Sequence, residues 1–458
     1  MVDNNAKPKL PLRWLPAALL TRIEKRYELQ QSIANIGWLS VQPMLDLTVG
    51  LLIGVWVARK LGPADYGTLS YAIAFVGLFS PLATFGVGIT VVRDLVRDPD
   101  ASSVILGSAT FLRALGSAAL LAVSCIVIAV LRPEDTMVWL FVGIVALGQA
   151  MRNLGTFELW FTAKVQGKYT TWSRSSAVIL SAMIKAALIL AGAGVMMFVI
   201  AYSLEVALTA ITMFVIYSTT ARMPVSRWRV RYELVGQIFK DSWPLVVAGF
   251  MSVVYMKIDQ VMIGEMRGEA EVGIYGVAAR LSETFHLLPS FIMTSVFPSL
   301  VKARKISQEL YLSRFQRLYD LFVWLGIVAA FLMQFLARPI VGFLYGEHYI
   351  ESGPVLAVHI WSGVFWAAGS TGHRYLITEN HMRIQLFMSI CGALANVALN
   401  FFLIPRFGPL GAAYASFASL GVSHWLSGIV FAPSRITVLF FLRAFYLPGL
   451  VKRWAKLW

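Results

Sequence analysis

The chain has 458 residues, of which 58% are hydrophobic and only 14% are charged, and its mean hydropathy is +0.70. A soluble chain of this length carries about a quarter charged residues, so the composition excludes an ordinary soluble enzyme, a disordered protein and a fibrous protein. What is left is an integral membrane protein, in which the net charge of +15 indicates basic loops held against anionic lipid rather than nucleic-acid binding.

The N-terminal arm, residues 1–35, is polar and basic. It lacks the compact apolar run and small-residue cleavage site of a secretory signal, so we do not expect it to be removed. Between Leu10 and Leu29, apolar side chains such as Trp14 and Leu19 are interleaved with basic ones such as Arg22. This pattern predicts an amphipathic helix lying on the inner membrane surface; a flexible tail is the alternative.

A membrane-spanning helix needs about 20 mostly apolar residues, and twelve such runs follow the arm. The fifth and sixth are separated only by Gly192, Ala193 and Gly194, which predicts a tight hairpin. The twelve runs lie at 36–58, 68–91, 104–131, 137–161, 172–191, 195–218, 242–264, 272–297, 318–337, 353–376, 383–404 and 410–432.

Lys and Arg are distributed unevenly between the two sets of connecting segments. The segments that lie inside when the N-terminus is cytoplasmic hold 27 of these residues, whereas the opposite loops hold six. Because cytoplasmic loops carry the excess of basic residues, both termini are predicted to be cytoplasmic. Termini on the same side of the membrane require an even number of spans, and this supports the count of twelve from a separate observation.

The longest inner segment, near residues 219–241, divides the chain into two sets of six helices. A Tyr-Gly pair recurs at the start of the second helix of each set, at Tyr66-Gly67 and Tyr275-Gly276. Two such copies are related by an axis along the membrane normal, with a substrate site near the midplane between them; a chance match is the alternative. We therefore expect an all-α protein with about 12 transmembrane helices in two six-helix lobes around a central cavity. The predicted parts are the arm at 1–35, an N-lobe at 36–222, a cytoplasmic linker at 223–241, a C-lobe at 242–432 and a basic cytoplasmic tail at 433–458.

Basic side chains at membrane depth are costly, at roughly 2.5–3.5 kcal/mol each when they face lipid. Six lie inside the predicted spans, and Arg174 is close enough to a helix end to reach the inner surface. We expect the other five to face a shared wet cavity that binds an anionic cargo, because Arg binds phosphate in a forked geometry; unrelated structural pairs are the alternative. These candidate substrate-binding residues are Arg113, Arg152, Lys185, Lys257 and Arg280.

Acidic residues at depth are candidates for binding and releasing an ion that drives transport. Glu283 is three residues from Arg280 on one helix face, which predicts that the two are neighbours. The ion-coupling candidates are Asp46, Glu205, Asp259 and Glu283.

Motifs for enzyme chemistry are missing from the sequence. There is no Walker motif, no dinucleotide fingerprint and no credible Ser-His-Asp arrangement, so we expect no catalytic residue and no cofactor. Cys125 and Cys391 lie far apart in apolar runs, and the six His residues show no pair at metal-ligand spacing. No metal site is therefore expected.

Five motifs in order resemble bacterial polysaccharide-biosynthesis membrane proteins, the Wzx-type O-antigen and capsule repeat-unit flippases of the multidrug, oligosaccharidyl-lipid and polysaccharide (MOP) exporter superfamily. The resemblance covers about residues 36–432. The motifs lie at Leu61–Gly67, Lys257–Gly264, Val272–Leu281, Leu344–Tyr349 and Leu399–Ala413.

The resemblance implies two helical lobes in the bacterial inner membrane and a transporter rather than an enzyme. Its implied cargo is an oligosaccharide on undecaprenyl pyrophosphate, moved from the inner to the outer leaflet by alternating access with an ion gradient. Membrane lipids, and a polysaccharide polymerase with its chain-length machinery, are the implied partners. No nucleic-acid partner is expected.

Three alternatives stay open. A cation or drug antiporter of the same superfamily favours an acidic cavity, which the five basic positions oppose. A membrane polymerase or ligase commonly has a large external loop, and the sequence has none longer than about 25 residues. A flippase for a lipid-linked peptidoglycan precursor differs only in its cargo.

Overall fold

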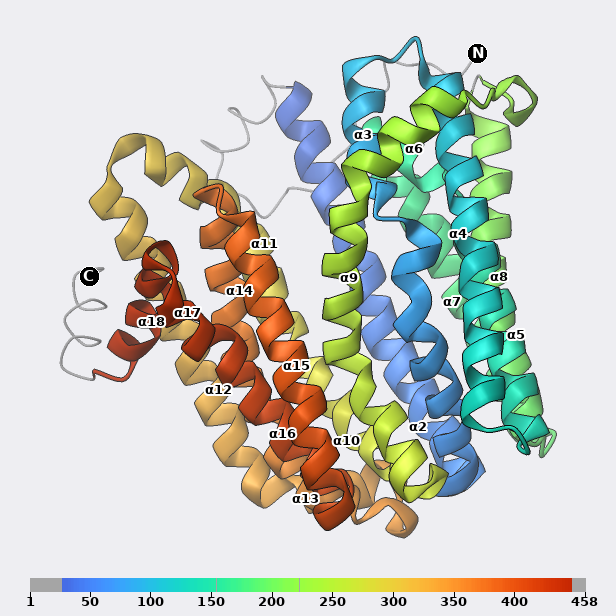
Figure 1. The fold of residues 1–458 in the computed structure, drawn as a ribbon, viewed down its shortest axis with the longest axis vertical. Helices are drawn as coiled ribbons and strands as arrows, with labels where there is room; N and C mark the ends of the chain where they lie inside the picture. The colour runs from blue at the N-terminus through green and yellow to red at the C-terminus, as the bar shows by residue number, and fades with distance from the viewer. Residues whose placement is uncertain (1–26, 154, 222, 447–458) are drawn as a thin grey trace. The chain divides into compact units, whose positions relative to one another are not determined.

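The computed structural model describes residues 27–153, 155–221 and 223–446, and this part of the chain consists of helices and their connections, without strands (Figure 1). The all-α fold class is therefore confirmed. Most of the predicted arm, with its amphipathic helix, and the end of the predicted tail lie outside the described residues.

Seven described α-helices and one 3-10 turn precede the middle of the chain, in an order close to that of the predicted runs. They are α2 (Tyr27–Thr84), α3 (Val87–Arg97), α4 (Ser102–Leu131), α5 (Thr136–Asn153), α6 (Phe157–Ala163), α7 (Gly167–Leu190), α8 (Val195–Thr220) and the 3-10 turn η1 (Val225–Arg227).

The remaining described elements follow η1, and more of them are short helices and turns than in the first half of the chain. They are α9 (Tyr232–Arg267), α10 (Glu269–Phe285), α11 (Leu287–Ile306), α12 (Gln308–Tyr345), the 3-10 turn η2 (Glu347–Tyr349), α13 (Ser352–His359), α14 (Ser362–Thr378), α15 (Met382–Phe407), α16 (Pro409–Gly421), the π-helical turn η3 (Val422–Leu426), α17 (Ser427–Val430) and α18 (Ala432–Ala444).

Seven stretches of the described chain are long and apolar enough to cross a membrane, or eight when a bent pair within 269–306 is counted as one. The chain is therefore a multi-pass membrane protein. One stretch, Gln42–Arg97, has 56 residues and is long enough for two crossings at about 20 residues each. Other predicted runs are divided into shorter helices, as at α13 and α14. The count of twelve spans stays a prediction.

The segment labelled α2 consists of two helices that meet at Gly62, within the connection predicted between the first two spans. Gly62 has a non-helical backbone, with a φ of 77° and a ψ of 172°. This left-handed φ favours glycine, and Pro63 restarts the helix with a φ that suits a first turn. The hairpin between α7 and α8 is confirmed, with Gly192 at a φ of 71°.

Contacts between residues divide the chain into two compact units. The first unit comprises 1–54, 82–127 and 143–246, and the second comprises 55–81, 128–142 and 247–458. The second unit thus combines two segments of the first half of the chain with the whole second half. The lobe boundaries predicted at 36–222 and 242–432 stay a prediction.

The first unit has two apolar clusters. One packs Val91 of α3 and Leu106 of α4 against Ile238 of α9, and the other surrounds Tyr217 of α8 with Phe157 and other rings. Helices α7 and α8 lie side by side as the predicted hairpin (Figure 1).

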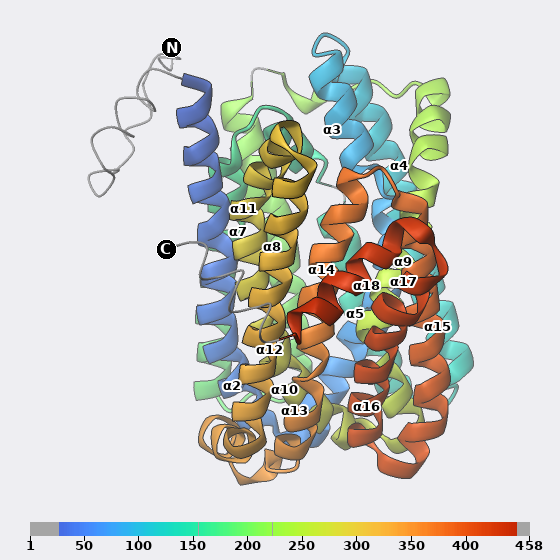
Figure 2. The same cartoon turned by 90° about the vertical axis from the view of Figure 1, so that its left-hand side faces the viewer.

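The second unit has an aromatic core that extends into the predicted tail. Phe315 of α12 and Tyr375 of α14 are buried there together with Phe440 and Phe441 of α18. Figure 2 shows α18 near α12 and α14, and contacts with both helices are present. Residues 432–444 are thus a packed helix, although their basic residues favoured a tail.

Candidate functional site

Asp259, in the middle of α9, lies in a buried polar cluster that draws on four helices of the second unit. Its carboxylate is 3% exposed and accepts hydrogen bonds from Tyr275 Oη of α10 at 2.6 Å, Ser416 Oγ of α16 at 2.5 Å and Asn400 Nδ2 of α15 at 2.5 Å. We call these four residues, with Asn396, the Asp259 cluster. Asn396 Oδ1 accepts from Asn400 Nδ2 at 3.1 Å.

The sequence builds this cluster from helical spacing. Asn396 and Asn400 are four residues apart on α15, so their side chains lie one turn apart on the same face. A buried carboxylate is stable only when hydrogen bonds or a partner charge compensate its lost hydration. Asn400 Oδ1 is buried and has no hydrogen-bond partner among the described residues, so the cluster still has an unused oxygen. The arrangement suits the binding of a proton or a small cation.

Two residues predicted for different roles form one ion pair in the first unit. Lys185 Nζ of α7 lies 2.6 Å from Glu205 Oε2 of α8, and Ser181 Oγ donates to the same carboxylate oxygen at 2.6 Å. The α7–α8 hairpin brings them together, since the two helices run side by side. Lys185 is therefore neutralised within the first unit.

The other predicted residues of the first unit have separate surroundings. The Arg113 guanidinium of α4 donates to the carbonyl of Gly155 at 3.0 Å, and Asp46 of α2 accepts from Gln42. Arg152 lies in α5, but its side chain is not among those that the structure describes. Arg174, which we expected to reach the inner surface, pairs with Glu158 at 2.7 Å.

In the second unit, Glu283 of α10 pairs with Lys257 of α9, with 3.6 Å between Glu283 Oε1 and Lys257 Nζ. Glu283 was expected to be a neighbour of Arg280 on one helix face, but its ion pair is with Lys257 of α9. Arg280 is exposed and forms no ion pair with any described residue. Lys257 and Asp259 have different partners, as their spacing of two residues predicts.

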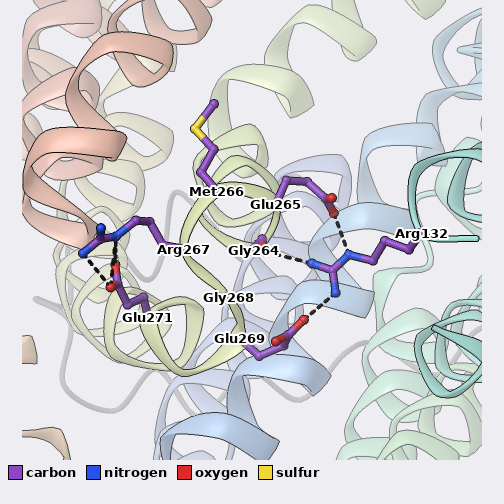
Figure 3. A pocket seen from close by; sticks show the side chains of 8 residues that line it. All are labelled: Arg132, Gly264, Glu265, Met266, Arg267, Gly268, Glu269 and Glu271. Carbon is purple, nitrogen blue, oxygen red and sulfur yellow. Dashed lines mark hydrogen bonds and ion pairs between the residues drawn. The ribbon is translucent and has the colours of Figure 1, made fainter. Parts of the chain in front are cut away.

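Arg132, which follows α4, is the centre of an ionic cluster. The sequence alone places this residue only among the charges of the outer loops. Its side chain is 12% exposed, and its Nε donates to Glu265 Oε1 at 2.9 Å (Figure 3). It also donates to Glu269 and, at 2.9 Å, to the carbonyl of Gly264. The Tyr71 ring of α2 lies 4.4 Å from the guanidinium, and its hydroxyl donates to Glu265.

We call Arg132, Tyr71, Glu265 and Glu269 the Arg132 clasp. It borders an open cavity of about 620 Å³ (Figure 3). Burial alone lowers the pKa of the Arg132 guanidinium, but its hydrogen bonds and the nearby carboxylates raise the pKa above its ordinary value. The Arg132 guanidinium therefore stays protonated.

A second cavity, of about 440 Å³, lies entirely in the second unit. Its walls come from α9, α11, α14, α15, α16 and η3. We call it the Arg374 chamber, after the basic residue that lines it together with Trp366, Ser290, Gln385 and Ser389. The sequence alone places Arg374 in a connecting loop and does not reveal this cavity, because no local pattern connects its walls.

Comparisons with known proteins agree with this architecture. A family model described as polysaccharide biosynthesis protein matches residues 32–304, more than half of the chain. The chain is 23% identical over 216 residues to the probable low-salt glycan biosynthesis flippase Agl15 of Haloferax volcanii. The match covers 46% of this chain and 46% of Agl15, so the chain aligns with about half the length of this curated relative.

Among solved structures, the fold is similar to that of the lipid II flippase MurJ in an inward closed conformation, with a TM-score of 0.65, 14% identity and coverage of 90% of this chain and 92% of that chain. It is also similar to an inward-facing multidrug resistance MATE family transporter of the MOP superfamily, with a TM-score of 0.66, 13% identity and coverage of 92% and 99%. The chain thus belongs to the polysaccharide biosynthesis protein family and has the fold of the MOP-superfamily transporters.

Proposed function

We propose that this protein is a flippase that moves an oligosaccharide linked to undecaprenyl pyrophosphate from the inner to the outer leaflet of the bacterial cytoplasmic membrane. Membership of the polysaccharide biosynthesis family, in a chain with a transporter fold, is the observation that carries the proposal. The partial match to a glycan biosynthesis flippase supports the same class of cargo. Both termini lie in the cytoplasm, as the distribution of Lys and Arg predicts. The product is then used by a polysaccharide polymerase and its chain-length machinery.

In this proposal Arg113, Arg152, Lys185, Lys257 and Arg280 form a cationic chamber that binds the pyrophosphate. Two of these residues already have carboxylate partners, Lys185 with Glu205 and Lys257 with Glu283. Their charges become available to the cargo when those pairs open. Arg280 is exposed and has no carboxylate partner among the described residues, so it is the first contact for an entering pyrophosphate.

An ion gradient drives the cycle, and Asp259 is the carboxylate best suited to couple to it. Of the four predicted candidates, Glu205 and Glu283 are neutralised by lysines, whereas Asp259 is surrounded by hydroxyl and amide groups. A proton or a small cation bound there removes a costly buried charge, and its release restores that charge. The lobes rock between inward-open and outward-open states as the ion and the cargo bind.

The double substitution Arg152→Ala with Arg280→Ala tests the chamber. We expect loss of surface polysaccharide in cells while the protein stays in the membrane, because two phosphate-binding charges are removed. The matched control is Arg267→Ala with Arg406→Ala, which removes two charges assigned to outer loops. Normal export by the first double variant would refute the chamber assignment. Failure of the wild-type protein to move any defined undecaprenyl-linked glycan in a leaflet-accessibility assay would refute the flippase proposal.

Other functions predict other outcomes. The fold similarity to a multidrug transporter favours a drug antiporter as the second candidate, and purified protein would then transport a cationic dye into liposomes. A polymerase or ligase would lengthen a sugar chain in vitro. A peptidoglycan precursor flippase would accept that lipid-linked precursor in preference to oligosaccharide repeat units.

A further inference from the structure

The Arg374 chamber has the size and the walls of a ligand site. Its volume of about 440 Å³ falls within the range of roughly 300–1,000 Å³ that is usual for small-molecule pockets. All of its lining residues belong to the second unit. The chamber is therefore a property of that unit alone, independent of the cationic residues proposed above.

Hydroxyl groups from several helices line the chamber. Ser290 and Thr294 of α11 donate to the carbonyls of His286 and Ser290 at 2.9 and 2.8 Å. Ser370 of α14 and Ser423 of η3 likewise donate to main-chain carbonyls, at 2.8 and 2.9 Å. Because these hydroxyl protons are already used, the oxygens of Ser290, Thr294 and Ser370 keep lone pairs that can accept hydrogen bonds. Such a wall suits a ligand that is rich in hydroxyl donors.

Arg374 supplies a positive charge for which the described part of the chain provides no ion pair. Its guanidinium lies 5.3 Å from the ring of Phe297. Glu379, the acidic residue nearest in sequence, is held by Arg304 at 2.8 Å. A guanidinium has five N–H donors and binds carboxylates in a forked geometry. The chamber thus joins one anion-binding group to a set of hydroxyl acceptors.

An aromatic platform completes the chamber. Trp366 of α14 stacks on the imidazole of His286, with ring centroids 4.2 Å apart and an angle of 10° between the rings. This contact holds the indole in one orientation. An indole offers a large apolar surface with a polar edge, which suits the mixed apolar and hydroxyl faces of a sugar ring.

The π-helical turn η3 forms the part of the wall next to α14. It brings Ser423 and His424 to the chamber, and π turns inside helices are frequent at functional sites. Gly369 makes this approach possible, because a Cβ there would overlap the imidazole of His424. The π turn and Gly369 thus shape the same part of the chamber wall.

We propose that the Arg374 chamber is a glycan subsite that recognises an acidic sugar residue of the cargo. The inference rests on the proposed flippase function and adds which chemical feature of the glycan is recognised. A single guanidinium among hydroxyl acceptors matches a sugar ring with one carboxylate. A pyrophosphate carries more charge and is better matched by several basic residues.

The test compares two undecaprenyl-pyrophosphate-linked oligosaccharides that differ only in one sugar: a uronic acid in the first, and its carboxyl-reduced hexose in the second. Binding to the full-length protein is measured by native mass spectrometry in detergent. We expect the wild-type protein to bind the acidic glycan at least about tenfold more tightly, the usual scale of one charge-assisted hydrogen-bonded contact. Arg374→Gln is expected to abolish this preference and to leave the affinity for the reduced glycan unchanged.

Two further variants separate recognition from folding. Arg383→Gln, which removes a neighbouring charge that does not line the chamber, is expected to keep the preference. Arg374→Lys keeps the charge without the fork and is expected to restore part of it. All three variants, Arg374→Gln, Arg374→Lys and Arg383→Gln, must elute as folded protein.

Three results would overturn the inference: equal affinity of the wild-type protein for the two glycans, equal weakening of both glycans by Arg374→Gln, or displacement of both glycans by phosphatidylglycerol bound at Arg374. Each of these leaves the flippase proposal intact, since lipid-linked glycan is still bound. The flippase proposal fails separately if neither glycan is bound or moved by the wild-type protein.

Discussion

Asp259 accepts hydrogen bonds from three helices, whereas the other acidic residues proposed for coupling in the described spans have local or lysine partners. An ion that replaces one of these hydrogen-bond donors therefore changes the interactions of the Asp259 carboxylate. Because its charge is compensated by neutral groups only, gain or loss of one positive charge changes the electrostatics of the whole cluster.

Asp259→Asn is expected to abolish the dependence of flipping on an ion gradient, because the neutral amide cannot bind and release the ion. The amide keeps nearly the same shape, so the protein should fold. We expect at least a tenfold loss of gradient-driven flipping, about 1.4 kcal/mol, measured in proteoliposomes with and without imposed proton or sodium gradients. Asp320→Asn neutralises a second buried carboxylate of the second unit and serves as the control. Unchanged gradient dependence in Asp259→Asn would exclude this residue from coupling.

Sequence patterns selected Asp259, Lys185 and Glu205 as functional candidates, but they did not reveal their partners. Helical spacing shows which residues share a face of one helix, as with Asn396 and Asn400, and it says nothing about which helix lies opposite. The pair of Lys185 with Glu205 and the chamber around Arg374 both depend on contacts between helices. Those contacts are set by packing, which has no local signature.

At the scale of helices, the two Tyr-Gly motifs have a physical explanation. They do not only echo each other along the sequence: within the second unit they pack against each other. A Cβ at Gly276 of α10 would lie 3.9 Å from the ring of Tyr66 of α2. Beside the motifs, a Cβ at Gly67 would overlap the carbonyl of Glu269, and a Cβ at Gly273 would overlap the carbonyl of Pro63. Small residues of this kind let two helix backbones approach closely, which stabilises helix pairs in membranes.

We therefore expect Gly67→Ala and Gly273→Ala each to destabilise the protein by about 1–3 kcal/mol, the usual cost of overpacking. Thermal unfolding in detergent, followed by tryptophan fluorescence, measures the effect. Gly77→Ala is the control on the same helix, because nothing lies within 4 Å of a Cβ at that position. If Gly67→Ala unfolds at the same temperature as Gly77→Ala, the close approach of α2 and α10 is wrong.

Apolar run length predicted the helices that stand alone, such as α4 and α15, to within a few residues of their ends. It also placed the connection between the first two spans, where Gly62 interrupts the helical backbone. It missed α18. Two arginines in α18 lowered its average hydrophobicity, although Phe440 and Phe441 fall on its buried side.

At the scale of the molecule, the Arg132 clasp connects segments from the two halves of the sequence within the second unit. Tyr71 and Arg132 belong to the first half of the sequence, and Glu265 and Glu269 belong to the second half, yet all four lie in one compact unit. An arginine held by two carboxylates and a carbonyl resists separation. The clasp therefore stabilises the packing of these segments in the second unit.

Arg132→Gln is expected to favour opening of the contact between these segments, by an energy on the order of 2 kcal/mol for the lost charged hydrogen bonds. A cysteine placed by Ser70→Cys, in a protein with Cys125 and Cys391 replaced by Ala, reports the opening through its rate of maleimide labelling. Arg267→Gln is the control, because Arg267 is 42% exposed and pairs with Glu271 on the same side of the contact (Figure 3). Equal labelling rates in the two variants would show that the clasp does not hold these segments together.

The turn η3 contains one residue more than an α-helical turn would use at the wall of the Arg374 chamber. Deleting one residue there restores a regular helix without breaking α16 or α17, while the side chains that follow swing around the axis. If the chamber is the glycan subsite proposed above, a single-residue change of length at 422–426 is expected to alter which sugar it accepts.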